Sequence, residues 1–300
     1  MMKIGFVGLG MMGRPMASCL VSLGQYKVIG YDISIENMEA AAELGVEQHA
    51  GSLCELAEIT DLIILMLQNG DIVREVVLGG KEEGLIKGLK SGSIILDMSS
   101  VSPFQTQELS EILAADGIRL VDAPVSGNVS KARTGQLAVM VGGDAEAIEY
   151  VMGPLNAMSR QVTHVGPVGS GHAIKSLNNL LSASGLIAAG EVLLIGKKFG
   201  LDSQIMLDIL NASTGRNNST ENKIGQFVLS RKFDGGFALN LMAKDLAIAL
   251  DVAKRCGVPS KHSALTREMV DAANSEEEPG SDHTALIRWL EKLSGVELDQ

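Results

Sequence analysis

The sequence has few cysteines and no excess of positive charge. Its 300 residues include three cysteines at wide spacing, Cys19, Cys54 and Cys256. An odd, dispersed set of this kind is typical of reduced, buried thiols in a cytosolic protein, and argues against a disulfide framework or a zinc site. The formal net charge is −11, whereas nucleic-acid binding requires a basic face. The charge therefore argues against a nucleic-acid partner, and any anion-binding site must carry its own local positive field.

The sequence also lacks a metal-ligand cluster and an uninterrupted transmembrane run. No histidines and cysteines stand at metal-ligand spacing. The histidines are scattered along the chain: His49, His164, His172, His262 and His283. The most apolar stretch, Leu180–Ile195, is interrupted by two serines, two glycines and Glu191, so a buried helix is expected rather than a membrane span. The apolar N-terminus runs directly into glycines and lacks the layout of a signal peptide. We expect a cytoplasmic protein without a metal or a membrane partner.

The first half of the chain alternates short apolar runs with helical patterns. The apolar runs predict strands at Ile4–Val7, Lys27–Tyr31, Leu62–Leu67, Ile94–Asp97 and Leu120–Ala123. Helices are predicted among them at Arg14–Leu23, Glu36–Leu44 and Pro103–Ala115. This alternation predicts parallel strands joined by crossover helices, in a sheet that is covered on both faces. The first half is therefore predicted to be a doubly wound α/β domain.

The second half of the chain shows only helical patterns. Ser170–Phe199 has neither proline nor a turn signal, and predicts one long helix of about 45 Å at ~1.5 Å per residue. Further helices are predicted at Ser203–Ala212, Lys223–Arg231, Leu239–Cys256, Ser260–Asn274 and Thr284–Leu293. We expect an α/β domain over residues 1–165 and an all-helical domain over residues 166–300, with the long helix as the bridge.

A glycine-rich turn joins the first predicted strand to the first predicted helix. It reads Gly8-Leu9-Gly10-Met11-Met12-Gly13. In a dinucleotide-binding turn the first glycine makes the tight bend, the second lets the backbone approach a pyrophosphate, and the third lets the helix pack on the strand. The helix N-terminus then offers N–H groups to the phosphates. These six residues are predicted to bind a dinucleotide in a Rossmann domain; a glycine turn without a ligand is the plainer alternative.

An acidic residue, Asp32, ends the second predicted strand. A carboxylate there accepts hydrogen bonds from the adenosine ribose and repels a 2′-phosphate. The next residues, Ile33 and Ser34, offer no arginine for such a phosphate. The position predicts NAD rather than NADP, although an ordinary strand-end acid is also compatible with it.

Two later segments carry groups suited to binding or catalysis. Asp122–Asn128 forms a loop in which Ser126 and Gly127 could bind a carboxylate; a plain connecting loop fits the pattern equally well. Gly169–Asn179 opens the long helix, where Lys175 and Asn179 share one face at a spacing of four. A lysine in a partly dry site acts as an acid or base near neutral pH. The same pattern fits a lysine whose side chain only extends to solvent. His172 is expected to be a structural hydrogen-bonding residue.

Taken together, the motifs resemble those of the β-hydroxyacid dehydrogenase family, over essentially the whole chain. Gly8–Met16 is similar to its cofactor motif. Asp122–Gly127, with Ala132, Gly135 and Leu137, is similar to its substrate motif. Gly169–Asn179 is similar to its catalytic motif, which places the catalytic lysine at Lys175 and a substrate-binding amide at Asn179. Asp97–Ser100 is similar to the family's loop beside the nicotinamide, and Lys244-Asp245-Leu246 is similar to its late cofactor motif. Ser100 and Lys244 are therefore expected to bind the cofactor, as is Leu67 at the end of the third predicted strand.

One position departs from the family pattern. Asn128 stands where the family has a second glycine. Asparagine tolerates a left-handed backbone better than most residues, so the loop is expected to keep its shape while the amide points toward the substrate. Asn128 and Arg216 are therefore candidate specificity residues. For Arg216, in the polar stretch 213–218, a solvated loop is an equal alternative.

The resemblance implies an NAD-dependent enzyme that interconverts a small β-hydroxy acid and its semialdehyde. Ser126, Gly127 and Asn128 would bind the substrate, and Lys175 would transfer the proton. Two alternatives stay open: an imine reductase, against which Lys175 with Asn179 argues, and a non-catalytic NAD-binding protein that recognises partners. The apolar long helix predicts a homodimer or homotetramer.

Overall fold

The structure, a computed structural model, describes residues 1–47 and 50–299 of the chain. The chain divides into two compact units, Met1–Lys175 and Ser176–Gln300. The division falls inside the long helix α8 (Ser170–Phe199), whose bounds are those expected from the sequence. The boundary expected near residue 165 lies before this helix.

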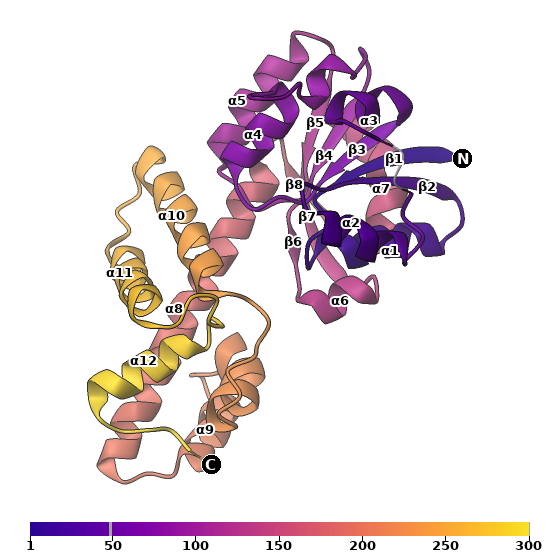
Figure 1. The fold of residues 1–300 in the computed structure, drawn as a ribbon. Helices are drawn as coiled ribbons and strands as arrows, with labels where there is room; N and C mark the ends of the chain where they lie inside the picture. The colour runs from indigo at the N-terminus through magenta and orange to yellow at the C-terminus, as the bar shows by residue number, and fades with distance from the viewer. Residues whose placement is uncertain (48–49, 300) are drawn as a thin grey trace. The chain divides into compact units, whose positions relative to one another are not determined.

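The first unit is built on an eight-stranded sheet (Figure 1). Its strands are β1 (Met2–Val7), β2 (Tyr26–Tyr31), β3 (Leu62–Leu65), β4 (Ile94–Asp97), β5 (Arg119–Asp122), β6 (Val125–Ser126), β7 (Leu137–Gly142) and β8 (Ser159–Gly166). The strand order is β2-β1-β3-β4-β5-β7-β6, with β8 paired to β7. Strands β1 to β5 are mutually parallel, so their carboxyl ends share one edge of the sheet. β7 runs antiparallel to β5 and β6, and β8 runs parallel to β7.

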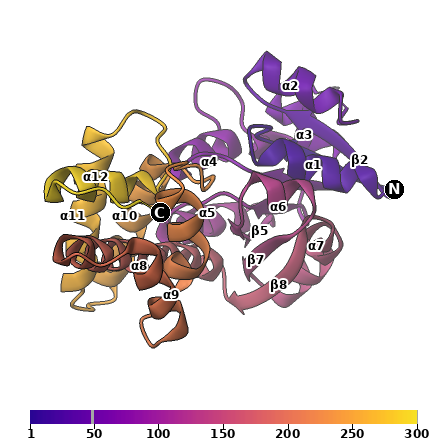
Figure 2. The same cartoon turned by 90° about the horizontal axis from the view of Figure 1, so that it is seen from below.

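Helices cover both faces of this sheet. They are α1 (Gly13–Ser22), α2 (Ile35–Ala42), α3 (Leu53–Ile59), α4 (Gly70–Leu78), α5 (Pro103–Ala114), α6 (Val129–Arg133) and α7 (Ala145–Met158), with a short 3₁₀ turn η1 (Leu85–Lys87). Side chains alternate along the strands, so Ile4 and Phe6 pack in one core with α1, α6 and α7. Val7 packs in a second core with α3, α4 and α5 on the other face. Figure 2 shows α1, α6 and α7 gathered together. The expected doubly wound domain is confirmed.

The last three strands were not predicted from the sequence. β7 has an apolar run, Leu137–Val141, that would have indicated it. β8 has no such signal, because most of its residues are exposed and polar. Helices α3, α4 and α7 begin at side-chain caps, in which Ser52, Asn69 and Asp144 each accept a hydrogen bond from a backbone N–H three residues later.

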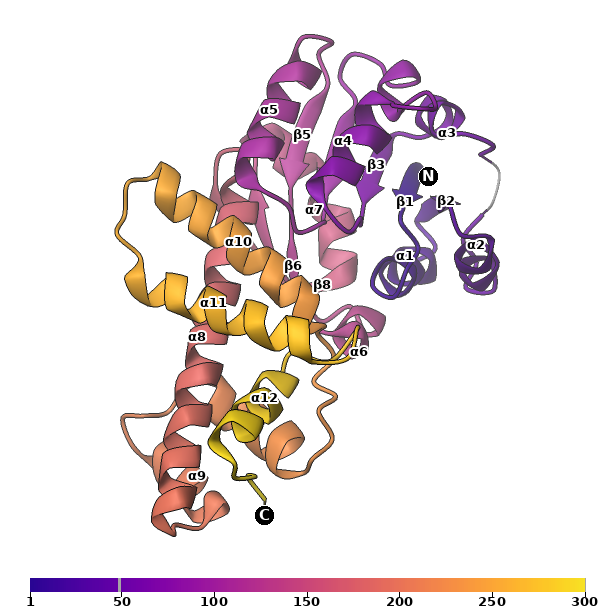
Figure 3. The same cartoon turned by 60° about the vertical axis from the view of Figure 1, so that its left-hand side comes forward.

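The second unit is entirely helical. Beyond α8 it contains α9 (Ser203–Ala212), η2 (Thr220–Leu229), α10 (Leu239–Arg255), α11 (Lys261–Glu276) and α12 (Ala285–Ser294). Helices α10 and α11 lie side by side (Figure 3). One core joins α8 to the other helices through buried side chains such as Leu193, Leu246 and Leu286. η2 has the wider turns of a π-helix, and begins before the predicted segment Lys223–Arg231.

Helix α8 is long and apolar enough to cross a membrane. However, 56% of its most apolar 18-residue window is buried against other parts of the protein. A core helix of a folded protein passes the same length and composition test, and this burial agrees with the expected buried helix.

Candidate active site

The glycine turn between β1 and α1 has the geometry of a ligand cradle. Gly8 has a φ of +93°, and a Cβ at this position would lie 2.3 Å from the Met66 carbonyl oxygen. A Cβ at Gly13 would lie 1.8 Å from the Gly8 carbonyl oxygen. A Cβ at Gly10, in contrast, would meet nothing within 4 Å. Gly8 and Gly13 thus close the turn, while Gly10 leaves its outer side accessible to a ligand. These residues fit a dinucleotide pyrophosphate.

Other residues of the turn divide between core and surface. Leu9 is fully buried, whereas the side chain of Met11 is 74% exposed. Met12 precedes the first helical residue of α1 and makes no side-chain cap. With no such cap at this end, the first N–H groups of α1 suit an anion.

Asp32 links the end of β2 to the glycine turn. Its Oδ2 accepts a hydrogen bond from the Leu9 N–H at 2.7 Å. Its Oδ1 accepts from the Ser34 N–H at 2.8 Å and from Asn37 Nδ2 at 3.2 Å. A carboxylate has about four acceptor positions, so the protein leaves about one for an incoming hydroxyl. Asp32 is therefore both a support for the turn and a candidate ribose ligand.

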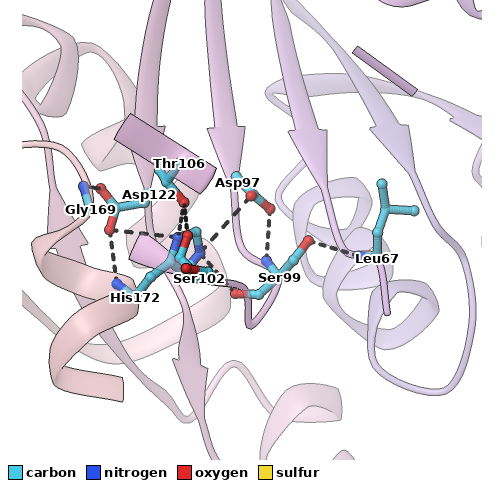
Figure 4. Close-up of polar contacts among 8 residues, drawn as sticks. All are labelled: Leu67, Asp97, Ser99, Ser102, Thr106, Asp122, Gly169 and His172. Carbon is cyan, nitrogen blue, oxygen red and sulfur yellow. Dashed lines mark hydrogen bonds and ion pairs between the residues drawn. The ribbon is translucent and has the colours of Figure 1, made fainter. Parts of the chain in front are cut away.

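A buried polar network lies at the carboxyl ends of β4 and β5 (Figure 4). The His172 side chain is fully buried between the two strand ends. Its Nε2 lies 3.1 Å from the Ser99 carbonyl oxygen, and its Nδ1 lies 2.7 Å from Thr106 Oγ1. Ser99 Oγ in turn accepts a hydrogen bond from the Leu67 N–H at 2.9 Å, which brings in the loop after β3. The network therefore ties the loops after β3 and β4 to α5 and α8.

Two buried carboxylates flank the His172 ring. Asp97 Oδ2 lies 4.0 Å from Nε2, and Asp122 Oδ2 lies 3.9 Å from Nδ1. Burial raises the pKa of the Asp97 carboxyl, while His172 and the Ser99 hydrogen bonds oppose that rise. Asp97 and Thr106 line a cavity of about 250 Å³ that extends to α4 and α5. The polar network therefore borders this cavity.

Asp122 anchors the start of α8. Its Oδ1 accepts a hydrogen bond from the Gly169 N–H at 2.7 Å, and its Oδ2 accepts from the His172 N–H at 2.9 Å. A carboxylate at a helix N-terminus is favoured by the helix dipole and satisfies otherwise unpaired N–H groups. Asp122, the last residue of β5, thus joins this strand to the helix that carries Lys175. Lys175 is half-buried and lies one turn beyond His172.

The candidate substrate loop follows β5. Ser126 is half-buried, and Gly127 has a φ of +146°, which favours glycine. The expected left-handed backbone at Asn128 is wrong, because its φ is −94° and its ψ is 178°. Instead, Asn128 Oδ1 accepts a hydrogen bond from the Lys131 N–H at 3.2 Å and caps α6. An N-cap requires extended backbone, so asparagine here serves the helix rather than a left-handed turn.

Within the second unit, two of the predicted site residues meet at one buried acid. Asn179 Nδ2 donates a hydrogen bond to Asp245 Oδ2 at 2.6 Å. Lys244 Nζ lies 3.6 Å from Asp245 Oδ1. Asp245 is 1% exposed. The acid therefore holds the amide of the predicted catalytic motif, and connects it to the predicted late cofactor motif.

Arg216 is exposed and lies 3.6 Å from Glu221, an ion pair in which the guanidinium is already partly satisfied. Among residues 1–47 and 50–299, no group of three or more His, Cys, Asp or Glu side chains could hold a metal ion. His49 lies outside the described residues.

The sequence analysis placed Asp97, Ser99, Asp122 and Asp245 in motifs but did not foresee the contacts by which they position the predicted site. It did not single out Thr106. Asp97 and Asp122 carry a usable signal, since each is an acidic residue that directly follows the apolar run of its strand. Thr106 carries none, because it lies 66 residues from its partner His172 and has the pattern of an ordinary helix residue.

Comparisons with known proteins agree with this architecture. Residues 3–166 match the family described as the NAD binding domain of 6-phosphogluconate dehydrogenase. Residues 169–290 match the family described as the NAD-binding region of NADP-dependent 3-hydroxyisobutyrate dehydrogenase.

Individual relatives match over almost their whole length. The 2-(hydroxymethyl)glutarate dehydrogenase of Eubacterium barkeri is 36% identical over 98% of this chain and 96% of its own. The 3-sulfolactaldehyde reductase of Escherichia coli strain K12 is 30% identical over 99% of this chain and 98% of its own. A structure of Mycobacterium tuberculosis 3-hydroxyisobutyrate dehydrogenase with L-serine has a TM-score of 0.89 and 28% identity, covering 97% of this chain and 99% of that one. The chain therefore belongs to the β-hydroxyacid dehydrogenase family, and it is a nicotinamide-dinucleotide-dependent oxidoreductase.

Proposed function

We propose that the protein interconverts a small β-hydroxy acid and its semialdehyde with NAD, using Lys175 as the proton-transfer residue. The observation that carries the proposal is the buried network at the ends of β3, β4 and β5. Hydrogen bonds connect Leu67, Ser99 and His172 to Asp122, and Asp122 holds the first turn of the helix that carries Lys175. One continuous hydrogen-bond network thus joins the predicted cofactor loops to the helix that carries the proposed acid–base residue.

The strand order predicts how the two halves of the cofactor lie along the carboxyl edge of the sheet. Ligands of open α/β sheets lie outside the carboxyl ends of the strands. With the pyrophosphate at the turn after β1, Asp32 after β2 lies on one side and suits the adenosine ribose. Leu67 and Ser100, after β3 and β4, lie on the other side and suit the nicotinamide half. The proposed cofactor residues are Gly8, Leu9, Gly10, Met11, Met12, Gly13, Asp32, Leu67, Ser100 and Lys244.

The proposed substrate-binding groups come from the loop after β5 and from α8. Ser126 and the Gly127 N–H bind the substrate carboxylate, with Asn128 beside them. Lys175 and Asn179, four residues apart on one helix, bind the reacting hydroxyl. The bound nicotinamide supplies the acceptor or donor of hydride. Lys175 takes the hydroxyl proton in the oxidative direction, and returns it to the developing alkoxide in the reductive direction.

The direct test is reduction of NAD, followed by absorbance, with a panel of short hydroxy acids. The panel includes 3-hydroxyisobutyrate, glycerate, 2-(hydroxymethyl)glutarate and sulfonated analogues. Turnover of at least one acid that depends on Lys175 supports the proposal. If NADH binds and every acid is inert, the proposal fails. Turnover of cyclic imines would then indicate an imine reductase, and no turnover at all would indicate a binding protein.

A change of cofactor preference tests the role of Asp32. Ile33 is 95% exposed, whereas Ser34 caps α2 through Asn37, so the arginine belongs at position 33. We expect Asp32→Ser with Ile33→Arg to shift the ratio of kcat/KM toward NADP by roughly 30- to 150-fold, which corresponds to about 2–3 kcal/mol for charged hydrogen bonds. Ile33→Arg alone is the control, and should shift the ratio less because Asp32 still repels the phosphate. An unchanged ratio in the double variant would remove Asp32 from the cofactor site.

A self-association surface is proposed on the second unit. Leu181, Ile195 and Phe199 are 74%, 70% and 83% exposed, and they follow one face of α8 at helical spacing. Ile205 and Ile209 of α9 are each 60% exposed at a spacing of four. Exposed apolar surface of this kind marks interaction sites, and one stripe can pair with itself in a twofold dimer. We propose a homo-oligomer that uses this surface.

We expect Ile195→Glu to reduce the number of subunits in the oligomer at micromolar concentration, because each twofold contact would bring two buried charges together. Sedimentation equilibrium measures the change. Asn274→Glu adds the same charge on the exposed side of α11 and serves as the control. A wild-type monomer, or an oligomer unaffected by Ile195→Glu, would contradict the proposed surface.

The proposed location is the cytosol. This proposal rests on the odd number and wide spacing of Cys19, Cys54 and Cys256 in the sequence. The expected burial of these thiols was wrong, because Cys19 and Cys54 are half-buried and Cys256 is exposed.

A further inference from the structure

We propose that His172 is a positioning residue for the nicotinamide half of the cofactor. It acts by donating a hydrogen bond from Nε2 to the Ser99 carbonyl, which fixes the direction of the Ser99–Ser100 peptide. The inference rests on the proposed cofactor site. In that site neither the cofactor nor the substrate contacts His172, so His172 acts through the residues that it positions.

The proton on Nε2 follows from the chemistry of its partner. Nε2 lies 3.1 Å from the Ser99 carbonyl oxygen, and a carbonyl oxygen only accepts hydrogen bonds. Nε2 must therefore carry the hydrogen, whatever the charge of the ring. The other nitrogen, Nδ1, lies 2.7 Å from Thr106 Oγ1, and this hydroxyl also donates to the Ser102 carbonyl oxygen at 3.1 Å. The ring is held at both nitrogens.

The surroundings prevent the ring from turning away from Ser99. The His172 side chain is fully buried, and the carboxylates of Asp97 and Asp122 stand about it at 4.0 Å and 3.9 Å. The His172 backbone N–H is itself bound to Asp122 Oδ2 at 2.9 Å. Rotation of the side chain would leave buried polar atoms without partners, which is costly. The donor on Nε2 is thus aimed at one carbonyl.

The consequence for the cofactor comes from peptide geometry. The Ser99–Ser100 peptide is trans, so its N–H points opposite to its carbonyl. When the carbonyl faces His172, the Ser100 N–H faces away from the buried network. Ser99 is also fixed through Oγ by the Leu67 N–H at 2.9 Å. His172 therefore controls the peptide that leads into Ser100, while the Ser99 side chain is held by a separate hydrogen bond from the loop after β3.

Two substitutions separate this role from simple packing. The amide nitrogen of glutamine reaches approximately the position of Nε2, and that of asparagine only the position of Nδ1. His172→Gln keeps a donor for the Ser99 carbonyl, whereas His172→Asn keeps a group near Thr106 and loses that donor. A residue that merely fills space would not show this preference for one ring position.

The experiment compares NADH with ADP-ribose, which lacks the nicotinamide. For His172→Asn we expect the Kd of NADH to rise about tenfold and the Kd of ADP-ribose to change by less than about twofold, as expected for one lost hydrogen bond. For His172→Gln we expect both constants to stay within about threefold of wild type. Equal weakening of both ligands, equal behaviour of the two variants, or no binding of either ligand by wild type overturns the proposal.

A measurement on the wild type covers the case in which a variant fails to fold. In protein labelled with ¹⁵N-histidine, the ring nitrogens of His172 should show Nε2 protonated, in a form protected from exchange. An unprotonated Nε2 overturns the proposal. These binding and spectroscopic results do not depend on turnover, so inert hydroxy acids would refute the proposed reaction without deciding the role of His172.

Discussion

Lys175→Ala lowers kcat by about a thousandfold and changes the Kd of NADH by less than about threefold. The expected loss lies in the range of general acid–base catalysis, because the variant has no group to take up or return the hydroxyl proton. The small change in affinity is expected because the pyrophosphate turn after β1 and Asp32 after β2 remain intact. Steady-state rates and NADH fluorescence titration measure the two quantities.

Controls for this variant come from the same helix and from small amines. Lys198 is exposed near the far end of α8, so Lys198→Ala should keep the wild-type kcat. Lys175→Arg keeps the positive charge but cannot release a proton near neutral pH, and should remain impaired. Primary amines added to Lys175→Ala should restore part of the rate in a concentration-dependent way. A kcat close to wild type in Lys175→Ala would refute the proton-transfer role.

The sequence was most informative where local patterns determine structure. Helix α8 was predicted with its observed bounds, because no turn signal interrupts Ser170–Phe199. The strands of the parallel sheet were recognisable, because strands buried on both faces carry continuous apolar runs, as in β3 and in β4 up to its last residue, Asp97. β8 could not be recognised in this way, since an exposed edge strand keeps no apolar run.

The candidate site was predictable as motifs but not as a network. His172 was expected to be a structural hydrogen-bonding residue, yet its partners could not be named. Ser99, Thr106 and Asp122 lie 73, 66 and 50 residues away along the chain, and only the sheet brings them together. The left-handed backbone expected at Asn128 was wrong for a different reason: its side chain caps the short helix α6, and an N-cap requires extended backbone.

Two alanine substitutions in one turn, Gly10→Ala and Gly13→Ala, should have opposite consequences. At Gly13 the new Cβ would lie 1.8 Å from the Gly8 carbonyl oxygen, a backbone atom that cannot move without opening the turn. We expect a loss of about 3 kcal/mol in the free energy of unfolding, as for overpacked cores. For a unit of this size the melting temperature should fall on the order of 10 °C.

At Gly10 the same methyl group meets no protein atom within 4 Å, and the backbone has no left-handed conformation to strain. Gly10→Ala should therefore melt within about 1 °C of wild type. Its methyl group would instead occupy the space through which a pyrophosphate approaches the backbone. We expect the Kd of NADH to rise roughly 30-fold, or about 2 kcal/mol. Calorimetry and fluorescence titration on the same samples separate the two effects. Unchanged NADH affinity in a stable Gly10→Ala variant would mean that the open side of this turn does not face the cofactor, since the fold on which the turn depends would be demonstrably intact.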